Sequence, residues 1–319
     1  MSLLEVRDLR VLVGDVPAID GVSFSIEPGQ RVGLIGESGC GKSLTALSIM
    51  GLLPDGLCAT GSVCFEGVNL LDLPEERVCH VRGDRIGMVF QEPMTALNPV
   101  MRIGDQIGEA LRIHRGHRRA EARAKAADLL ARVHMPDAGA KLRAYPHQLS
   151  GGQRQRAMLA AAVACGPALL IADEPTTALD VTVQAQMLVL LDGLVREEGM
   201  GLLLITHDLP VVAGMCEEVL VMYGGHLVEQ GEAQAVFAEP RHPYTAGLVA
   251  AIPEVGERAR SQRLRTVPGS VPPLGAFPAG CVYRDRCPRA DDVCREMPPL
   301  EGTLREVACW HPVTEAAER

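Results

Sequence analysis

The sequence predicts an α/β fold with a largely parallel sheet, on two observations. Short apolar runs with the composition of buried strands lie between turn residues, at 31–36, 84–90, 168–173, 201–208 and 218–223. Helical patterns separate several of these runs, as at 42–53 and 181–199. Strands that alternate with helices in this way are joined by crossover connections, which place the strands parallel in one sheet.

The composition is that of a globular protein with room for one large domain and one small domain. Of the 319 residues, 47% are hydrophobic, which is enough to fill a core. The net charge of -9 argues against a nucleic-acid partner, because phosphate neutralisation needs a clustered positive excess. The N-terminal residues lack the pattern of a secretory signal, and the longest uncharged run, 157–172, is too short to cross a membrane. We therefore expect a cytosolic location and ten cysteines that are mostly free thiols.

Two regions depart from the alternation of strands and helices. From about 100 to 165 the sequence is helical and rich in Ala and Arg, which predicts a helical subdomain inserted between elements of the sheet. After about residue 250 it becomes rich in Pro and Gly, as in a linker, and then carries four cysteines. We therefore predict a large domain over 1–250 and, over 251–319, a linker with a small C-terminal cysteine-rich extension.

The strongest local signal is GESGCGKS, which lies between a predicted strand and a predicted helix. Glycines let backbone N–H groups curl around phosphate oxygens, and a helix N-terminus adds positive potential. Lys42 is placed to reach the terminal phosphates, and Ser43 offers a hydroxyl to magnesium. The predicted nucleotide site comprises Gly36, Glu37, Ser38, Gly39, Cys40, Gly41, Lys42 and Ser43. The thiol of Cys40 is either sensitive to oxidation or simply fills a variable position.

Two acids follow the apolar run 169–172. Asp173 fits a second anchor for magnesium, held through water, and Glu174 fits the base that polarises the attacking water. His207 follows another predicted strand, where it can contact the γ-phosphate and hold that water in line. Such residues are common at strand ends, and their interpretation as a catalytic site depends on the phosphate loop upstream.

The stretch LSGGQ, at 149–153, precedes a long helical pattern and is a second candidate anion site. The simpler alternative is a serine helix cap followed by glycines. LSGGQ also resembles the signature of ATP-binding cassette (ABC) ATPases, and the resemblance extends over roughly residues 3–250. In that family the signature loop of one subunit closes over the ATP that another subunit holds.

The resemblance implies ATP and Mg²⁺ as cofactors and a role for each matching position. Gln91 corresponds to the Q-loop residue, which contacts magnesium together with Ser43 and Asp173, and Asp180 corresponds to the D-loop. His207 corresponds to the switch histidine. The residues implied to contact ATP in trans are Leu149, Ser150, Gly151, Gly152 and Gln153. One position departs from the family pattern: Val13 stands where an aromatic residue usually stacks on adenine, which implies looser nucleotide discrimination or an apolar contact.

Two further stretches, 90–99 and 239–253, together with the cysteine tail, resemble ATP-binding subunits of bacterial oligopeptide and dipeptide importers. The resemblance implies ATP-driven import of peptides or a similar small solute, by a peripheral subunit on the cytoplasmic face of the membrane. It also implies two membrane permeases, a second homologous ATP-binding subunit and, indirectly, an external solute-binding protein. A soluble ABC ATPase of DNA repair or translation, or an exporter ATPase, is the alternative. The solute, and whether the two ATPases are identical, stay open.

The four C-terminal cysteines are separated by intervals of five, six and fourteen residues, wider than the usual spacing of structural zinc ligands. A reducing cytosol disfavours disulfides. Four thiolates can hold an iron–sulfur cluster, and the family resemblance implies a [4Fe–4S] centre, with zinc as the alternative. The proposed ligands are Cys281, Cys287, Cys294 and Cys309. We expect the cluster to supply folding energy to a short segment and to have a structural or docking role, separate from ATP binding.

Overall fold

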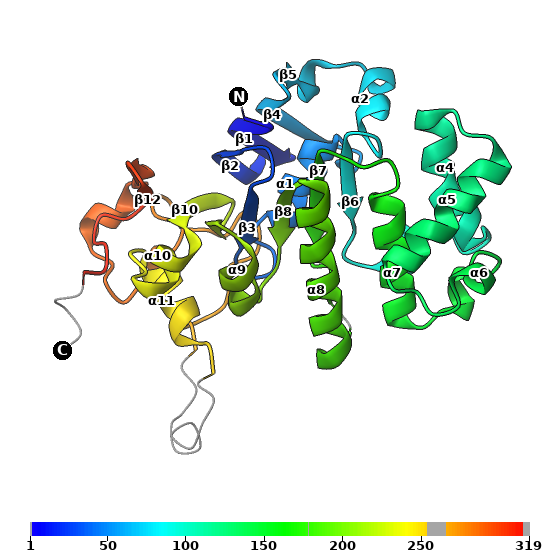
Figure 1. Cartoon of the computed structure of the whole chain (residues 1–319). Coiled ribbons are helices and arrows are strands. Elements are labelled where there is room, and N and C mark those ends of the chain that lie inside the picture. The colour runs from blue at the N-terminus through cyan, green and yellow to red at the C-terminus, as the bar shows by residue number, and fades with distance from the viewer. Residues whose placement is uncertain (1, 178, 254–265, 315–319) are drawn as a thin grey trace. The chain divides into compact units, whose positions relative to one another are not determined.

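The computed structural model describes residues 2–177, 179–253 and 266–314 (Figure 1). The chain forms two compact units. The first, here called the signature unit, comprises Met1–Leu4, Ile26–Gln30 and Phe65–Ile205. The second, here called the phosphate-loop unit, comprises Glu5–Ser25, Arg31–Cys64 and Thr206–Arg319.

The signature unit contains three parallel strands, β6 (Ile86–Val89), β7 (Leu169–Asp173) and β8 (Gly201–Ile205). Every residue of these strands is buried, as expected for parallel strands covered on both faces. The crossover from β7 to β8 is α8 (Val181–Glu198) (Figure 1). All three strands were predicted from apolar runs, and the structure confirms them.

The remaining elements of this unit are mainly helices. Between residues 100 and 165, the described chain forms no strand; its helices are α4 (Ile103–Arg115), α5 (Arg119–Arg132), α6 (Ala138–Lys141) and α7 (Gly151–Ala162). Helix α4 buries Ile103, Ile107 and Leu111, which recur every four residues and therefore share one face. Shorter elements precede it: β5 (Val68–Asn69), α2 (Glu75–Val81) and α3 (Pro93–Ala96).

The phosphate-loop unit contains a sheet with the strand order β11-β12-β10-β9-β3. Strands β3 (Arg31–Ile35) and β9 (Glu218–Tyr223) are parallel and confirm two further predicted strands. Strand β10 (His226–Glu232) pairs antiparallel with β9 and, on its other side, with β12 (Arg305–Val307). Strand β11 (Glu301–Gly302) pairs with β12. The C-terminal segment therefore extends the sheet that carries the phosphate loop.

Most of a second sheet belongs to the same unit. Its neighbouring strands there are, in order, β2 (Val16–Ile26), β1 (Leu4–Val13) and β4 (Leu57–Phe65). The helices of the unit are α1 (Lys42–Met50), α9 (Leu209–Met215), α10 (Ala233–Ala238) and α11 (Pro243–Ala250). Helix α9 packs directly on β3. The contact is so close that a Cβ added to Gly33 of β3 would lie 2.4 Å from the side chain of Val212. Within the described part of the chain, no helix combines the length and apolarity needed to cross a membrane.

The C-terminal segment, described from residue 266 to 314, packs on the core of the phosphate-loop unit. The predicted linker falls partly outside the described residues, at 254–265. Beyond it, Tyr283 is almost fully buried and meets Tyr223 of β9 edge to face, with ring centroids 5.1 Å apart. Phe277 meets the same ring at 6.0 Å. Three of the chain's four tyrosines, Tyr223, Tyr244 and Tyr283, pack against one another here, and their contacts hold the segment on the unit.

Candidate functional site

The phosphate loop lies between the end of β3 and the start of α1, as predicted. Gly36, Gly39 and Gly41 have φ values of 153°, 82° and 106°, which side chains rarely adopt. A Cβ on Gly36 would also lie 2.2 Å from the carbonyl oxygen of Met222. No side chain caps the N-terminus of α1 at Gly41. The local backbone therefore needs glycine and directs the first amides of a helix toward the loop.

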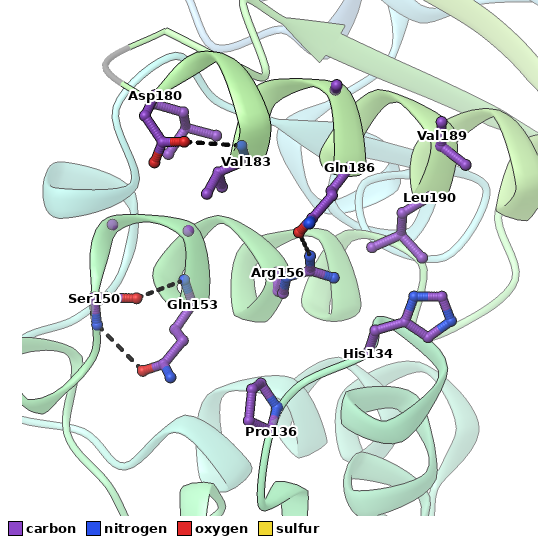
Figure 2. Close-up of a pocket in the computed structure, with 14 residues that line it drawn as sticks. His134, Pro136, Ser150, Gln153, Arg156, Asp180, Val183, Gln186, Val189 and Leu190 are labelled. Carbon is purple, nitrogen blue, oxygen red and sulfur yellow. Dashed lines mark hydrogen bonds between the residues drawn. The ribbon is translucent and has the colours of Figure 1, made fainter.

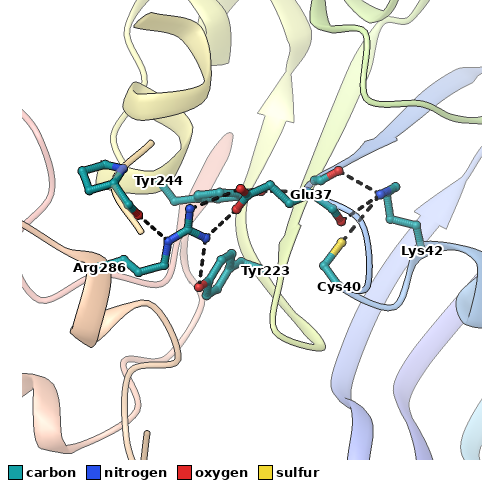
Figure 3. Close-up of polar contacts among 8 residues, drawn as sticks. Glu37, Cys40, Lys42, Tyr223, Tyr244 and Arg286 are labelled. Carbon is teal, nitrogen blue, oxygen red and sulfur yellow. Dashed lines mark hydrogen bonds and ion pairs between the residues drawn. The ribbon is translucent and has the colours of Figure 1, made fainter. Parts of the chain in front are cut away.

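Lys42 is buried, and its ammonium donates to the carbonyl oxygens of Gly36 and Glu37, at 2.8 and 3.0 Å. The loop therefore holds the cation against its own backbone (Figure 3). Cys40 is also fully buried, and burial raises the pKa of its thiol. A buried, protonated thiol is a poor nucleophile, so the structure favours a space-filling role for Cys40 over redox sensitivity.

The phosphate loop has a neighbour that sequence reasoning missed. The backbone N–H of Glu37 donates to the hydroxyl of Tyr244, at 2.8 Å. The carboxylate of Glu37 accepts two hydrogen bonds from the guanidinium of Arg286, at 2.6 and 3.2 Å (Figure 3). The only available signals were that Tyr244 lies in the importer-like stretch 239–253 and that Arg286 precedes Cys287.

The signature unit brings Gln91 and Glu174 together. The Oε2 atom of Glu174 accepts hydrogen bonds from Gln91 Nε2, at 3.1 Å, and from Thr177 Oγ1, at 2.8 Å. Asp173, the last residue of β7, is buried beside it. Glu174 itself has a φ of 44°, which is unfavourable for a residue with a side chain. Such backbone conformations cluster at functional sites, because the surrounding structure must hold them in place.

The signature stretch caps α7. The Oγ of Ser150 accepts from the N–H of Gln153, and Gln153 Oε1 accepts from the N–H of Ser150, at 3.3 and 3.2 Å (Figure 2). The serine cap weighed from sequence is therefore present, and it coexists with an open helix N-terminus, because Ser150 and Gly151 are exposed. Leu149 is buried and anchors the stretch.

A pocket of about 880 Å³ adjoins the signature stretch (Figure 2). Ser150, Gly151, Gly152 and Gln153 line it together with Asp180. Asp180 caps α8, with its carboxylate accepting from the N–H of Val183 at 3.0 Å. The signature stretch and Asp180 thus border one cavity of the signature unit.

Helix α7 is also tied to the loop that carries Glu174. The amide of Gln155, which is buried, donates to the carbonyl oxygen of Pro175 at 2.5 Å. Pro175 directly follows Glu174. The position of the signature helix and that of the candidate base are therefore linked through one buried hydrogen bond.

His207 belongs to the phosphate-loop unit. It is exposed and lies between Thr206, whose N–H donates to Leu34 of β3 at 3.3 Å, and Asp208, which caps α9. Leu34 lies two residues before Gly36. His207, which follows Thr206, therefore lies at the same end of β3 as the phosphate loop. Val13, at the end of β1, is 41% exposed.

The four C-terminal cysteines lie close enough to affect one another's charge. Cys281 and Cys294 are buried, and Cys287 and Cys309 are half-buried. Burial raises the pKa of Cys281, Cys287 and Cys309, to about 11 for Cys309. The charge of Cys294 adds to all three shifts. In the described part of the chain, no three of these sulfurs lie within 4.8 Å of one another, whereas the ligand atoms of Asp291, Cys294 and His311 do.

Comparison with known proteins decides the family. Residues 19–177 match the model of the ABC transporter family, and residues 228–294 match the oligopeptide/dipeptide transporter C-terminal region. The chain is 48% identical to the oligopeptide transport ATP-binding protein OppD of Salmonella typhimurium, over 98% of this chain and 95% of that protein. The chain belongs to the family of oligopeptide transport ATP-binding proteins.

Other members of this family of oligopeptide transport ATP-binding proteins are equally similar. OppD of Escherichia coli is 48% identical over 98% of this chain and 94% of that protein. A putative peptide import ATP-binding protein of Brucella melitensis is 49% identical over 93% of each chain.

Solved structures confirm the cassette fold. The ATP-binding cassette MJ0796, in a dimeric post-hydrolysis state bound to ADP and Pi, superimposes with a TM-score of 0.65 and 28% identity. The match covers 72% of this chain and 98% of that chain. For cbiO1 from Clostridium perfringens, part of an ABC transporter complex, the TM-score is 0.64 with 27% identity, over 75% of this chain and 91% of that chain. The predicted α/β fold of an ABC nucleotide-binding cassette is therefore correct.

Proposed function

We propose that this chain is the ATP-hydrolysing subunit of a membrane importer for peptides or a similar small solute. The observation that carries the proposal is near-full-length identity of 48% to oligopeptide transport ATP-binding proteins, including the C-terminal region. The same relatives disfavour the two alternatives, a soluble ABC ATPase and an exporter. The chain then lies on the cytoplasmic face of the membrane as a peripheral subunit.

The phosphate loop, residues 36–43, would hold the nucleotide, with Lys42 on its terminal phosphates. Mg²⁺ would be held by Ser43, Gln91 and Asp173, which offer a hydroxyl, an amide oxygen and a carboxylate. These are the oxygen ligands that magnesium prefers. Because Gln91 uses its amide nitrogen on Glu174, its amide oxygen is the atom to offer to the metal. The ion would neutralise charge on the phosphate oxygens.

Glu174 is the proposed general base, and His207 the residue that steadies the γ-phosphate and the attacking water. Two hydrogen bonds orient the Glu174 carboxylate before any substrate arrives, from Gln91 and from Thr177. Orientation of this kind lowers the cost of aligning a base in the transition state. Val13 would offer the adenine an apolar contact in place of stacking.

The signature stretch, Leu149–Gln153, and Asp180 would serve ATP that a second subunit holds. An exposed helix N-terminus beside a pocket suits a phosphate that arrives from another molecule. The second subunit is proposed to be a homologous ATP-binding protein, so that the pair is a heterodimer with two composite sites.

Permease docking is proposed to use the surface that follows Gln91. Met94 of α3 is 57% exposed and Val100 is 82% exposed, although both are apolar. Exposed apolar residues that lie close together in sequence suit a helix from a membrane partner. Two permeases would bind the ATPase pair, and an external solute-binding protein would act through them. Nucleic acid is not an expected partner.

The four C-terminal cysteines are proposed to hold a [4Fe–4S] cluster. Burial, and to a smaller extent the neighbouring cysteines, raise the pKa of Cys281 and Cys309, and a bound cationic metal centre would stabilise their thiolates. A tetrahedral zinc site with Zn–S bonds of about 2.3 Å needs sulfurs about 3.8 Å apart. Zinc is the alternative; among the described residues, no three of the four sulfurs lie within 4.8 Å of one another.

The test is transport. The chain, produced with its permeases and partner ATPase, is reconstituted in vesicles with the solute-binding protein on the side of the membrane opposite the ATPase. ATP-dependent peptide accumulation that Glu174→Gln abolishes is the expected result. Glu197→Gln, an exposed change on α8 away from the proposed site, is the matched control. A chain that hydrolyses ATP at full rate without permeases, and does not bind membranes that contain them, would point to the soluble alternative.

A further inference from the structure

The C-terminal segment reaches the phosphate loop through one ion pair. Arg286 lies in the 3-10 turn Arg284–Arg286, directly before Cys287. Its guanidinium donates one hydrogen bond to each carboxylate oxygen of Glu37. Glu37 is the second residue of the phosphate loop. A bidentate arginine–carboxylate pair fixes orientation as well as distance, so it restrains where Glu37 lies.

Arg286 is a buried cation whose guanidinium has several hydrogen-bond partners. Its side chain is 5% exposed, against 30% for Glu37. Its Nε donates to the carbonyl oxygen of Pro268 at 2.7 Å, and one terminal nitrogen also donates to the hydroxyl of Tyr223. Burial alone would lower the pKa of Arg286, but the hydrogen bonds to Glu37 and Tyr223 raise it above the ordinary value. A buried cation with these partners is costly to displace.

A second contact holds the same loop residue from α11. Tyr244 is fully buried and accepts the N–H of Glu37. His242 positions Tyr244, because its Nδ1 accepts the N–H of that tyrosine at 3.1 Å. Burial lowers the pKa of His242 to about 3, so the ring is neutral and able to accept. The importer-like stretch 239–253 thus positions a tyrosine on the phosphate loop.

The thiols and Arg286 belong to one compact turn. The N–H of Arg284 donates to the carbonyl oxygen of Cys281 at 3.0 Å, and that of Cys287 donates to Arg284 at 3.2 Å. The N–H of Arg286 donates to Tyr283 at 3.0 Å. Successive hydrogen bonds therefore span the whole interval between two proposed ligands. Arg286, which holds Glu37, therefore lies within the turn that joins these two cysteines and directly precedes Cys287.

We propose that Arg286 is a positioning residue of the nucleotide site, which couples the integrity of the four-cysteine cluster to the affinity of the phosphate loop. The proposal rests on the proposed function, in that the phosphate loop binds the nucleotide. Sequence analysis assigned the cysteines a role separate from ATP binding, and the contact between Arg286 and Glu37 argues for a connection.

The first test measures the affinity of the full chain for ADP with Mg²⁺ by titration calorimetry, which avoids turnover. Arg286→Ala should weaken ADP binding about tenfold, the usual size of effect for a lost charge-assisted contact. Arg286→Lys should recover part of the loss. Arg295→Ala is the control, because it removes an exposed arginine of the same segment whose ion pair with Asp292 lies at the surface. Arg286→Ala that binds ADP as tightly as Arg295→Ala overturns the proposal.

The double variant Glu37→Gln/Arg286→Ala tests whether the arginine acts through Glu37. If it does, the double variant binds ADP no more weakly than the weaker single variant, because both changes remove one interaction. Additive losses would show that Arg286 acts elsewhere and would overturn the assignment. Arg286→Lys provides the same comparison if Arg286→Ala does not fold.

Cys287→Ser tests the connection to the thiols without assuming which metal is bound. It should weaken ADP binding, and it should add no further loss in an Arg286→Ala background. ADP binding by Cys287→Ser that equals the wild type overturns the coupling. Lys42→Ala, titrated alongside, distinguishes a failure of the coupling from a failure of the nucleotide site: if it binds ADP normally, the proposed nucleotide site itself is wrong.

Discussion

Gln91 Nε2 donates to Glu174 Oε2 at 3.1 Å, so the proposed magnesium ligand and the proposed base share a hydrogen bond. Both residues belong to the signature unit and follow buried strands, β6 and β7. In the proposed site, this hydrogen bond would link magnesium binding at the amide oxygen of Gln91 to water activation at Glu174.

Substitution of Glu174 should separate binding from hydrolysis. Glu174→Gln keeps the side-chain shape but removes the base, so hydrolysis should fall by about 100-fold or more while ATP binding persists. Lys42→Ala should instead lose nucleotide binding, because it removes the cation on the terminal phosphates. Steady-state turnover and ATP titration of both variants provide the check, with Glu197→Gln as the control. Near-normal turnover in Glu174→Gln would rule out its assignment as the base.

Thr177 should affect hydrolysis through Glu174. Thr177→Val removes the hydroxyl that donates to the carboxylate at 2.8 Å and keeps a similar volume. A neutral hydrogen bond contributes about 1 kcal/mol, so kcat should fall several-fold with little change in KM. Thr182→Val, an exposed change on α8, is the matched control. Equal kcat values for the two variants would show that Thr177 does not orient the base.

Gln155 should matter for stability and for turnover. Gln155→Met keeps a similar length but leaves the carbonyl oxygen of Pro175 without its donor, at a cost of about 1–3 kcal/mol in the free energy of unfolding. Because Pro175 follows Glu174, hydrolysis should slow as well. Chemical denaturation and turnover measure the two effects. Gln234→Met, an exposed change on α10, should change neither, and an equal loss in that variant would show that the effect is not specific to the buried bond.

Hydrolysis should depend on assembly. If the signature stretch serves a nucleotide held by another subunit, the isolated chain should hydrolyse ATP slowly and be stimulated by its permeases and partner ATPase. Ser150→Arg should obstruct the composite site while leaving ATP binding by its own chain intact, because the proposal assigns Ser150 to ATP held by a second subunit and Lys42 to the ATP of its own chain. A monomer that works at the rate of the full complex contradicts the composite site.

The cysteine cluster has a direct chemical test. Protein purified without oxygen should be brown and contain iron and acid-labile sulfide in equal amounts, about four of each per chain. Each of the four cysteines changed to serine should lower both contents. Cys58→Ser, an exposed cysteine outside the cluster, is the control. Stoichiometric zinc without sulfide would show that the four cysteines bind a zinc ion and not an iron–sulfur cluster.

The sequence predicts what depends on local pattern. Strands such as β7 were predicted because they are continuous apolar runs, and the phosphate loop because its glycines and lysine stand at fixed spacing. Ser150 was predicted either as a helix cap or as part of an anion site; the structure confirms the cap, and the anion site stays a prediction. The cassette fold follows from these elements in their order.

The residues that sequence analysis missed act over long separations. Glu37 and Arg286 are 249 residues apart, and no local periodicity relates them. Gln155 meets Pro175 through a side chain whose direction depends on how α7 packs. Such contacts are set by packing, which the pattern of residues does not specify.

Strand β12 has a consequence for how the protein is made. It pairs with β10, so the sheet that carries the phosphate loop stays incomplete until residue 307 has left the ribosome. Domains fold as units during synthesis, which adds about 5–20 residues per second to the chain. Until then β10 has an unpaired edge, and exposed strand edges favour aggregation. A premature stop between β10 and β12 would therefore produce an aggregation-prone chain, although the phosphate loop and Glu174 would already have been translated.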